Sequence, residues 1–137
     1  MACRIKRKRN GNKSVLSITY KGHFSIPACV LNHPDYIELS YPSKALLIDI
    51  GAQYNGRNNG DLQCSRNVMS SRGWTSNATR ERALKELIAR EWLLLTKQGG
   101  MGIGPNLYAI TWQPIHECGG KHDFKPTTLA YRSFANA

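Results

Sequence analysis

The sequence has no hydrophobic run long enough to cross a membrane. Its longest apolar stretches, residues 45–48 and 92–95, are far shorter than the roughly 20 residues that a spanning helix needs. Residues 10–13 are Asn-Gly-Asn-Lys, where a secretion signal with a positive start requires an apolar segment. We therefore expect a cytoplasmic protein that has no membrane partner.

Paired cysteines are also missing. The four cysteines are scattered along the chain and form no Cys-x-x-Cys motif, which favours free thiols over a disulfide framework. His116, Cys118 and His122 are residue types that suit zinc, but their spacing is not a strong zinc motif. Whether these three residues bind metal is left open by the sequence.

No set of catalytic residues stands out. The glycine-rich segment 99–104 resembles a phosphate-binding loop only in composition, because it joins two predicted strands and does not open a helix. A Gly-Lys-Ser or Gly-Lys-Thr motif is absent from the sequence. We expect no enzyme activity and no cofactor.

Acidic residues are absent from the first 21 positions. This segment holds seven of the 19 Lys and Arg residues, whereas the remaining residues hold twelve bases and all nine acids. We interpret residues 1–14 as a flexible basic arm that attracts a polyanion such as a phosphate backbone. The alternative is a solvated tail that only keeps the protein soluble.

A chain of 137 residues suits one domain with a real core. Alternation predicts a strand over residues 15–20, and Pro27 opens a short helical turn. Apolar spacing after a capping Ser40, or Ser43, predicts a helix over 40–54. Residues 56–61 form a polar loop with no apolar residue, so we expect it to bury nothing. A short helix follows over 66–70, capped by Ser65.

The best-defined element is a long helix from about Ala78 to Trp92. Three good capping residues, Thr75 to Asn77, precede it, and one apolar stripe is formed by Ala83, Leu84, Leu87, Ile88 and Trp92. Strands over 93–97 and 106–112, joined by the glycine-rich loop, predict a hairpin. Residues 113–137 are interpreted as an extended C-terminal tail.

This order of helix, short helix, long helix and hairpin resembles the winged helix-turn-helix family over residues 40–112. Residues 75–88 look like recognition helices of MarR-like and GntR-like regulators, with a capped start, Thr79 and the pattern Ala83-Leu84-x-x-Leu87. Residues 24–54 and 112–121 also resemble small winged-helix proteins of phages and prophages. The resemblance implies a mainly helical α+β domain over 15–112, with a two-stranded wing between the basic arm and the tail.

Two positions depart from that family. Glu91 stands where many members have glycine before the first wing strand, so we expect a different turn geometry. Arg80 occupies a position usually filled by Val or Leu. Its side chain either packs inward or reaches DNA, and the sequence leaves both open.

The predicted function is sequence-specific binding of double-stranded DNA, because an α-helix fits the major groove and its first residues reach base edges. We expect the helix to contact DNA through Ser76, Asn77, Thr79, Arg80, Arg82 and Lys85. Phosphate contacts are expected from Arg66, Arg72, Lys97, Arg4, Lys6, Arg7, Lys8 and Arg9. The wing tip either offers backbone N–H groups to phosphate or is a plain hairpin turn, and the sequence leaves both open.

The biological role stays open between a transcriptional regulator and a replication-associated protein of a phage or mobile element. One alternative is a winged-helix protein-interaction module, such as a phage-encoded inhibitor or adaptor of host machinery. Another is an RNA binder that uses the basic arm. The sequence leaves open whether the protein forms a homodimer.

Overall fold

The computed structural model describes residues 3–10, 13–20 and 24–133. Strand β1 (Cys3–Asn10) pairs with β2 (Lys13–Tyr20) in an antiparallel sheet of their own. The sequence predicted a flexible arm there and a strand only from residue 15. The missed signal is Gly11-Asn12, a pair typical of two-residue hairpin loops.

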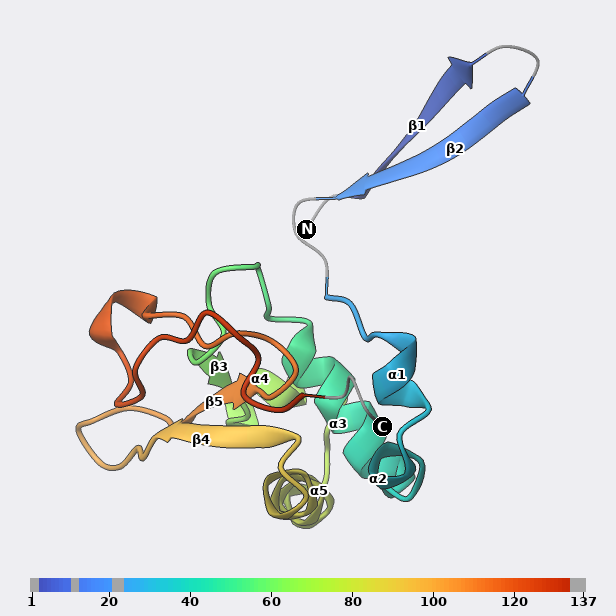
Figure 1. Ribbon diagram of the computed structural model, residues 1–137. Helices are drawn as coiled ribbons and strands as arrows, with labels where there is room; N and C mark the ends of the chain where they lie inside the picture. Colours follow the sequence, from blue (N-terminus) through green and yellow to red (C-terminus); the bar gives the residue numbers. More distant parts are fainter. Residues whose placement is uncertain (1–2, 11–12, 21–23, 134–137) are drawn as a thin grey trace.

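Three helices precede the sheet of the main body, as Figure 1 shows. They are α1 (Ala28–Leu31), α2 (Pro34–Ile37) and α3 (Tyr41–Gly51). The Ser40 side chain caps α3 by accepting a hydrogen bond from the Ser43 N–H, which confirms Ser40 as the cap. Helix α3 ends at Gly51 rather than at residue 54. Beyond it, the Gln53 side chain bonds both backbone groups of Gln63, which ties the loop to the sheet.

Two further helices follow the first strand of this sheet. Helix α4 (Arg66–Ser70) is capped by Ser65, as predicted, and α5 (Asn77–Ala89) is capped by Ser76. The apolar stripe of α5 packs on α3, and Ala83 and Leu87 are buried there. Helix α5 is shorter than predicted because the chain leaves it through a tight C-cap before Trp92.

That C-cap has the geometry of a Schellman motif. The N–H of Glu91 donates to the Ile88 carbonyl at 3.0 Å, and the N–H of Trp92 donates to the Leu87 carbonyl at 2.8 Å. Glu91 adopts a φ of 59°, the left-handed conformation in which glycine is preferred. The expectation of a different turn geometry was therefore wrong: Glu91 takes up the glycine-type conformation itself.

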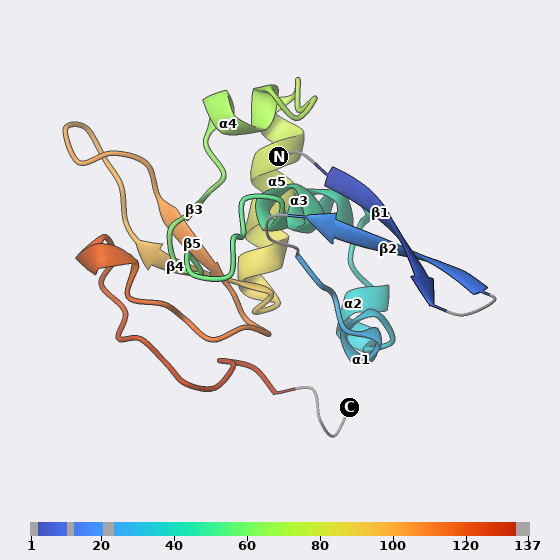
Figure 2. The same cartoon turned by 90° about the horizontal axis from the view of Figure 1, so that it is seen from above.

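The main sheet has three antiparallel strands in the order β3-β5-β4. They are β3 (Leu62–Gln63), β4 (Leu93–Lys97) and β5 (Leu107–Ile110). The predicted hairpin is confirmed by the pairing of β4 with β5. The described residues thus form an α+β fold with five α-helices and a three-stranded antiparallel sheet, as Figures 1 and 2 show. None of its helices, within the part that the structure describes, has the length and apolarity to cross a membrane.

The core is centred on Trp92, whose side chain is fully buried. Its ring meets the rings of Tyr36 and Trp112 edge-on, at centroid distances of 5.8 and 6.1 Å. Leu46, Leu47, Ile50, Met69 and Leu87 complete the centre with no exposed surface. Burial of this apolar surface is the main stabilising contribution to the fold.

The polar loop after α3 is exposed at Gly56 and Arg57 but buried at Asn59 and Gly60, so the expectation that it buries nothing was wrong. Asn59 is fully buried: its Nδ2 donates to the carbonyls of Ile110, Gln113 and Pro114, and its Oδ1 accepts from the Ile110 N–H. Gly60 has a φ of 124°, and a Cβ there would lie 2.6 Å from the His122 ring. The loop buries hydrogen-bonding groups instead of apolar ones, because backbone groups inside the fold need partners.

The C-terminal segment packs on the body, which the sequence had interpreted as an extended tail. Ile115 is 1% exposed, and a 3-10 turn, η1 (Cys118–Gly120), follows it. Near the end of the segment, the Arg132 guanidinium lies 4.7 Å from the centre of the Trp92 ring and also bonds Asp35 on α2. That bond lowers the pKa of the Asp35 carboxyl. The segment therefore belongs to the folded unit.

Candidate nucleic-acid interface

The start of α5 divides its polar residues into capping and exposed ones. Ser76 accepts hydrogen bonds from the Thr79 N–H at 3.2 Å and from the Thr79 hydroxyl at 3.1 Å. Both hydroxyl groups are thus engaged in the cap. Asn77, the first residue of the helix, is exposed. Of the three polar residues predicted to reach DNA here, Asn77 is the one whose side chain no bond within residues 24–133 engages.

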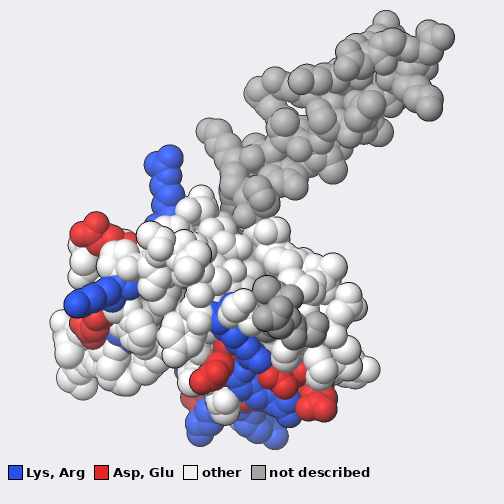
Figure 3. Space-filling view, in the orientation of Figure 1, with Lys and Arg blue, Asp and Glu red and all other residues white. Residues whose placement is uncertain are grey.

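The outer face of α5 carries two exposed cations. Arg82 and Lys85 are both exposed, and neither forms an ion pair within residues 24–133. Arg66, in the first turn of α4, is also exposed and lacks an ion pair in that range. Figure 3 shows Lys and Arg side chains gathered around α5 and α2 at the lower edge of the molecule, interspersed with acids. These three cations keep their charge available for an external anion.

Glu86 fixes the inner edge of the same helix. Its carboxylate accepts bonds from the Ser40 N–H and hydroxyl and from the Ser43 hydroxyl, at 2.9 to 3.0 Å. Burial raises the pKa of this carboxyl, but the bonds from Ser40 and Ser43 outweigh it, so the pKa lies below its usual value. The first turn of α3 is thereby locked to α5, which sets the orientation of the exposed face. No local pattern in the sequence marks Glu86, because its partners Ser40 and Ser43 lie more than 40 residues earlier in the chain.

Arg72 has an internal partner. Its Nε and one terminal nitrogen lie 3.2 and 3.0 Å from the Asp49 carboxylate on α3. The other oxygen of that carboxylate accepts a bond from the Trp74 indole N–H at 2.7 Å. Asp49 therefore anchors the turn between α4 and α5, and Arg72 is part of this anchor. A DNA phosphate would have to compete with Asp49 for Arg72.

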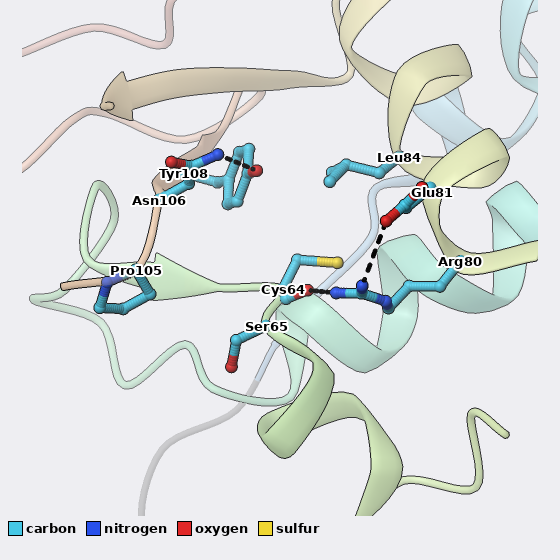
Figure 4. Close-up of a pocket in the computed structure, with 8 residues that line it drawn as sticks. All are labelled: Cys64, Ser65, Arg80, Glu81, Leu84, Pro105, Asn106 and Tyr108. Carbon is cyan, nitrogen blue, oxygen red and sulfur yellow. Dashed lines mark hydrogen bonds and ion pairs between the residues drawn. The ribbon is translucent and has the colours of Figure 1, made fainter. Parts of the chain in front are cut away.

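Arg80 packs inward, which answers the question that the sequence left open. Its side chain is 12% exposed and donates to the Cys64 carbonyl, as Figure 4 shows. Its Nε is buried and has no hydrogen-bond partner among the described residues. Burial raises the pKa of the neighbouring Cys64 thiol to about 11. Arg80 thus joins α5 to the segment after β3 and does not extend outward to a base.

A pocket of about 290 Å³ separates α5 from the β4–β5 hairpin. Arg80, Glu81 and Leu84 line it on the helix side, while Pro105 and Asn106, just before β5, line it on the side of the hairpin (Figure 4). The start of β5 is therefore next to the N-terminal half of α5. Lys97, at the end of β4, is partly exposed and forms no ion pair within residues 24–133.

The three candidate metal ligands lie near the polar loop that contains Asn59, and three ring nitrogens of the two histidines lie at hydrogen-bonding distance from protein groups there. His116 Nδ1 accepts from the Asn59 N–H, His122 Nδ1 accepts from the Phe124 N–H, and His122 Nε2 lies 2.6 Å from the His116 carbonyl. Burial raises the pKa of the Cys118 thiol. Within residues 24–133, no three His, Cys, Asp or Glu side chains are grouped to hold a metal ion.

The side chains of the predicted basic arm, Arg4, Lys6, Arg7, Lys8 and Arg9, lie outside what the structure describes, although their backbone forms β1. Comparisons with known proteins add no relative: no family model, curated protein or solved structure matches the chain.

Proposed function

We propose that the protein is a winged helix-turn-helix module that binds double-stranded DNA in a sequence-specific manner. The element order α3-β3-α4-α5-β4-β5 and the sheet order β3-β5-β4 support this architecture. In it, α4 and α5 form the helix-turn-helix, α5 is the recognition helix, and the β4–β5 hairpin is the wing. A helix of 13 residues is about 20 Å long, enough to lie in a major groove about 12 Å wide.

The observation that carries the proposal is the contrast between two groups of cations. Arg72 and Arg80 are bonded to the protein itself, whereas Arg82 and Lys85 project from α5 without an ion pair in the described chain. An unpaired cation on the outer face of a helix favours phosphate or the guanine edge. In the proposal, Asn77 and Arg82 contact bases, while Lys85 and Arg66 contact phosphates.

Binding to a duplex selected from a random pool tests this proposal. Fluorescence anisotropy would measure affinity over a range of salt concentrations for the full chain and its variants. Arg82→Ala should cost about 1–3 kcal/mol and relax selectivity at one base pair. Lys85→Ala should weaken all duplexes alike and reduce the slope of log K against log salt by about one unit.

Lys125→Ala is the matched control, because Lys125 is an exposed cation of the C-terminal segment without an ion pair in the described residues. Its affinity and salt slope should equal those of the wild type. The proposal is wrong if the pool yields no preferred sequence, or if R82A and K125A have the same effect.

A protein-interaction module is the second candidate, favoured by apolar side chains on the outer face of α3. Tyr41 and Ile48 are 85% and 47% exposed, and their spacing of seven residues places them on the same side of the helix. A second copy of the chain is one occupant of such a face. Analytical ultracentrifugation of the wild type and of Y41S/I48S would detect it, and an unchanged monomer in both would exclude self-association through α3.

A further inference from the structure

The tip of the wing exposes two large apolar side chains. Met101 is fully exposed and Ile103 is 62% exposed, both in the loop between β4 and β5. No acidic residue lies between Lys97 and Asn106, so nothing in the loop repels a phosphate backbone. Apolar groups placed this far from the core contribute nothing to its burial.

The loop holds these side chains in a defined turn. The Gly100 N–H donates to the Gly104 carbonyl at 3.0 Å, and the Ile103 N–H donates to the Gly100 carbonyl at 3.1 Å. At its base, the Asn106 side chain accepts from the Gly99 N–H at 2.6 Å. These three N–H groups are used inside the loop, so they are not free to bind phosphate. The tip therefore presents side chains more than backbone donors.

Glycines make the tip narrow. Gly102 and Gly104 have positive φ values of 76° and 106°, and a Cβ at either position would meet no atom within 4 Å. Met101 and Ile103 thus alternate with residues that have no side chain. A tip that carries only every second side chain can bring Met101 and Ile103 to the minor groove of B-DNA, which is about 6 Å wide, with little steric hindrance from their neighbours.

The base of the loop lies beside the recognition helix of the proposed function, and its tip projects away from that helix. Pro105 and Asn106 share the lining of the pocket in Figure 4 with Arg80 and Glu81 of α5. In Figure 2 the loop from β4 to β5 extends to the same end of the molecule as α4 and the start of α5. With α5 in the major groove, the wing lies over the flanking part of the duplex.

We propose that Met101 and Ile103 form an apolar wedge that enters the minor groove beside the α5 site and partly unstacks one base step. This inference rests on the proposed function. Met and Ile are among the side chains that open base steps from the minor groove, and pyrimidine–purine steps yield most easily. The wedge therefore selects a deformable step at a position where no polar side chain reads a base.

Fluorescence of 2-aminopurine tests the wedge, because this base is quenched by stacking and brightens when it is unstacked. The probe is the selected duplex with 2-aminopurine placed in turn at each position flanking the α5 site. Wild-type protein should raise the signal at one flanking step, most strongly when that step is TA or CA. M101S/I103S should still bind the duplex through α5, but with lower overall affinity because the wedge is missing. It should not raise the fluorescence at any flanking step.

Leu129→Ser is the matched control, since Leu129 is an apolar residue, 78% exposed, in the C-terminal segment. It should leave both affinity and fluorescence unchanged. The wedge alone is overturned if M101S/I103S retains the fluorescence rise, or if the variant changes only self-association and the tip is a protein contact. If the wild type binds no duplex, the proposed function fails, and the wedge fails with it.

Discussion

Glu91 lends itself to a substitution that should stabilise the protein. It occupies the C′ position of the α5 cap with a φ of 59°, and its side chain is exposed and has no ion pair within residues 24–133. Glu91→Gly therefore removes a conformational conflict without removing a contact. The flanking bonds, from the Glu91 and Trp92 N–H groups to Ile88 and Leu87, involve backbone atoms only and are retained.

The magnitude follows from two opposing effects. The left-handed conformation destabilises the folded state by about 1–2 kcal/mol for a residue with a Cβ. Glycine avoids this cost, but it stabilises the unfolded chain by about 0.5–1 kcal/mol because it gives that chain more conformational freedom. The net gain in the free energy of unfolding is about 1 kcal/mol, which corresponds to a rise in Tm of about 4 °C for a domain of this size.

Thermal and urea denaturation followed by circular dichroism would measure this gain. Glu91→Ala is the control, because it removes the same carboxylate but keeps the Cβ. We expect E91A to match the wild type and E91G to exceed both. Equal stabilisation by the two variants would refute the conformational reasoning and point to the charge of Glu91 instead.

Two further changes test how the loop and the helix pair are held. Asn59→Ala leaves the buried N–H and carbonyl of Ile110 unpaired and should lower the free energy of unfolding by about 3–4 kcal/mol, whereas the exposed neighbour Asn55→Ala should cost about 1 kcal/mol or less in the same urea titration. Equal losses for N59A and N55A would contradict this assignment. Glu86→Gln should cost about 1 kcal/mol near pH 7. Because the folded pKa of Glu86 is lowered, its contribution is present above its ordinary pKa and is lost as the pH falls through the folded value. Urea titrations should therefore show the gap between wild type and E86Q narrowing as the pH falls below the ordinary carboxyl pKa of 4.5, and a gap that stays constant on acidification would exclude the carboxylate charge as its source.

The sequence predicted the elements whose signals are local. The spacing of Leu46, Leu47 and Ile50 and the caps Ser65 and Ser76 depend on neighbours within a few residues, and the structure confirms the helices that they predicted. The pairing of β4 with β5 was likewise predicted from their β-prone residues and the glycine-rich loop between them.

What the sequence missed depends on partners that are distant along the chain. Asn59 bonds the backbone of Ile110, 51 residues away, and nothing around it marks it as buried. Arg72 was predicted to bind phosphate, but in the fold it bonds the carboxylate of Asp49, which lies 23 residues earlier in the chain. Two orientations were possible for the Arg80 side chain, because its position in the first turn of α5 allows it to point either inward or outward. A one-dimensional pattern identifies the cations of a site but not which of them already have a partner.

The polar loop over residues 56–61 is a poor insertion site in its buried half, which contains Asn59 and Gly60. A polar loop with glycines is where a label or an affinity tag is usually inserted. Here Gly56 and Arg57 are exposed, and a Cβ at Gly56 meets no atom within 4 Å, so an insertion there is accommodated in solvent. Three residues later, at Asn59-Gly60, the same insertion would separate the C-terminal segment from the sheet. Tolerance to insertion thus changes from high to absent within a single loop.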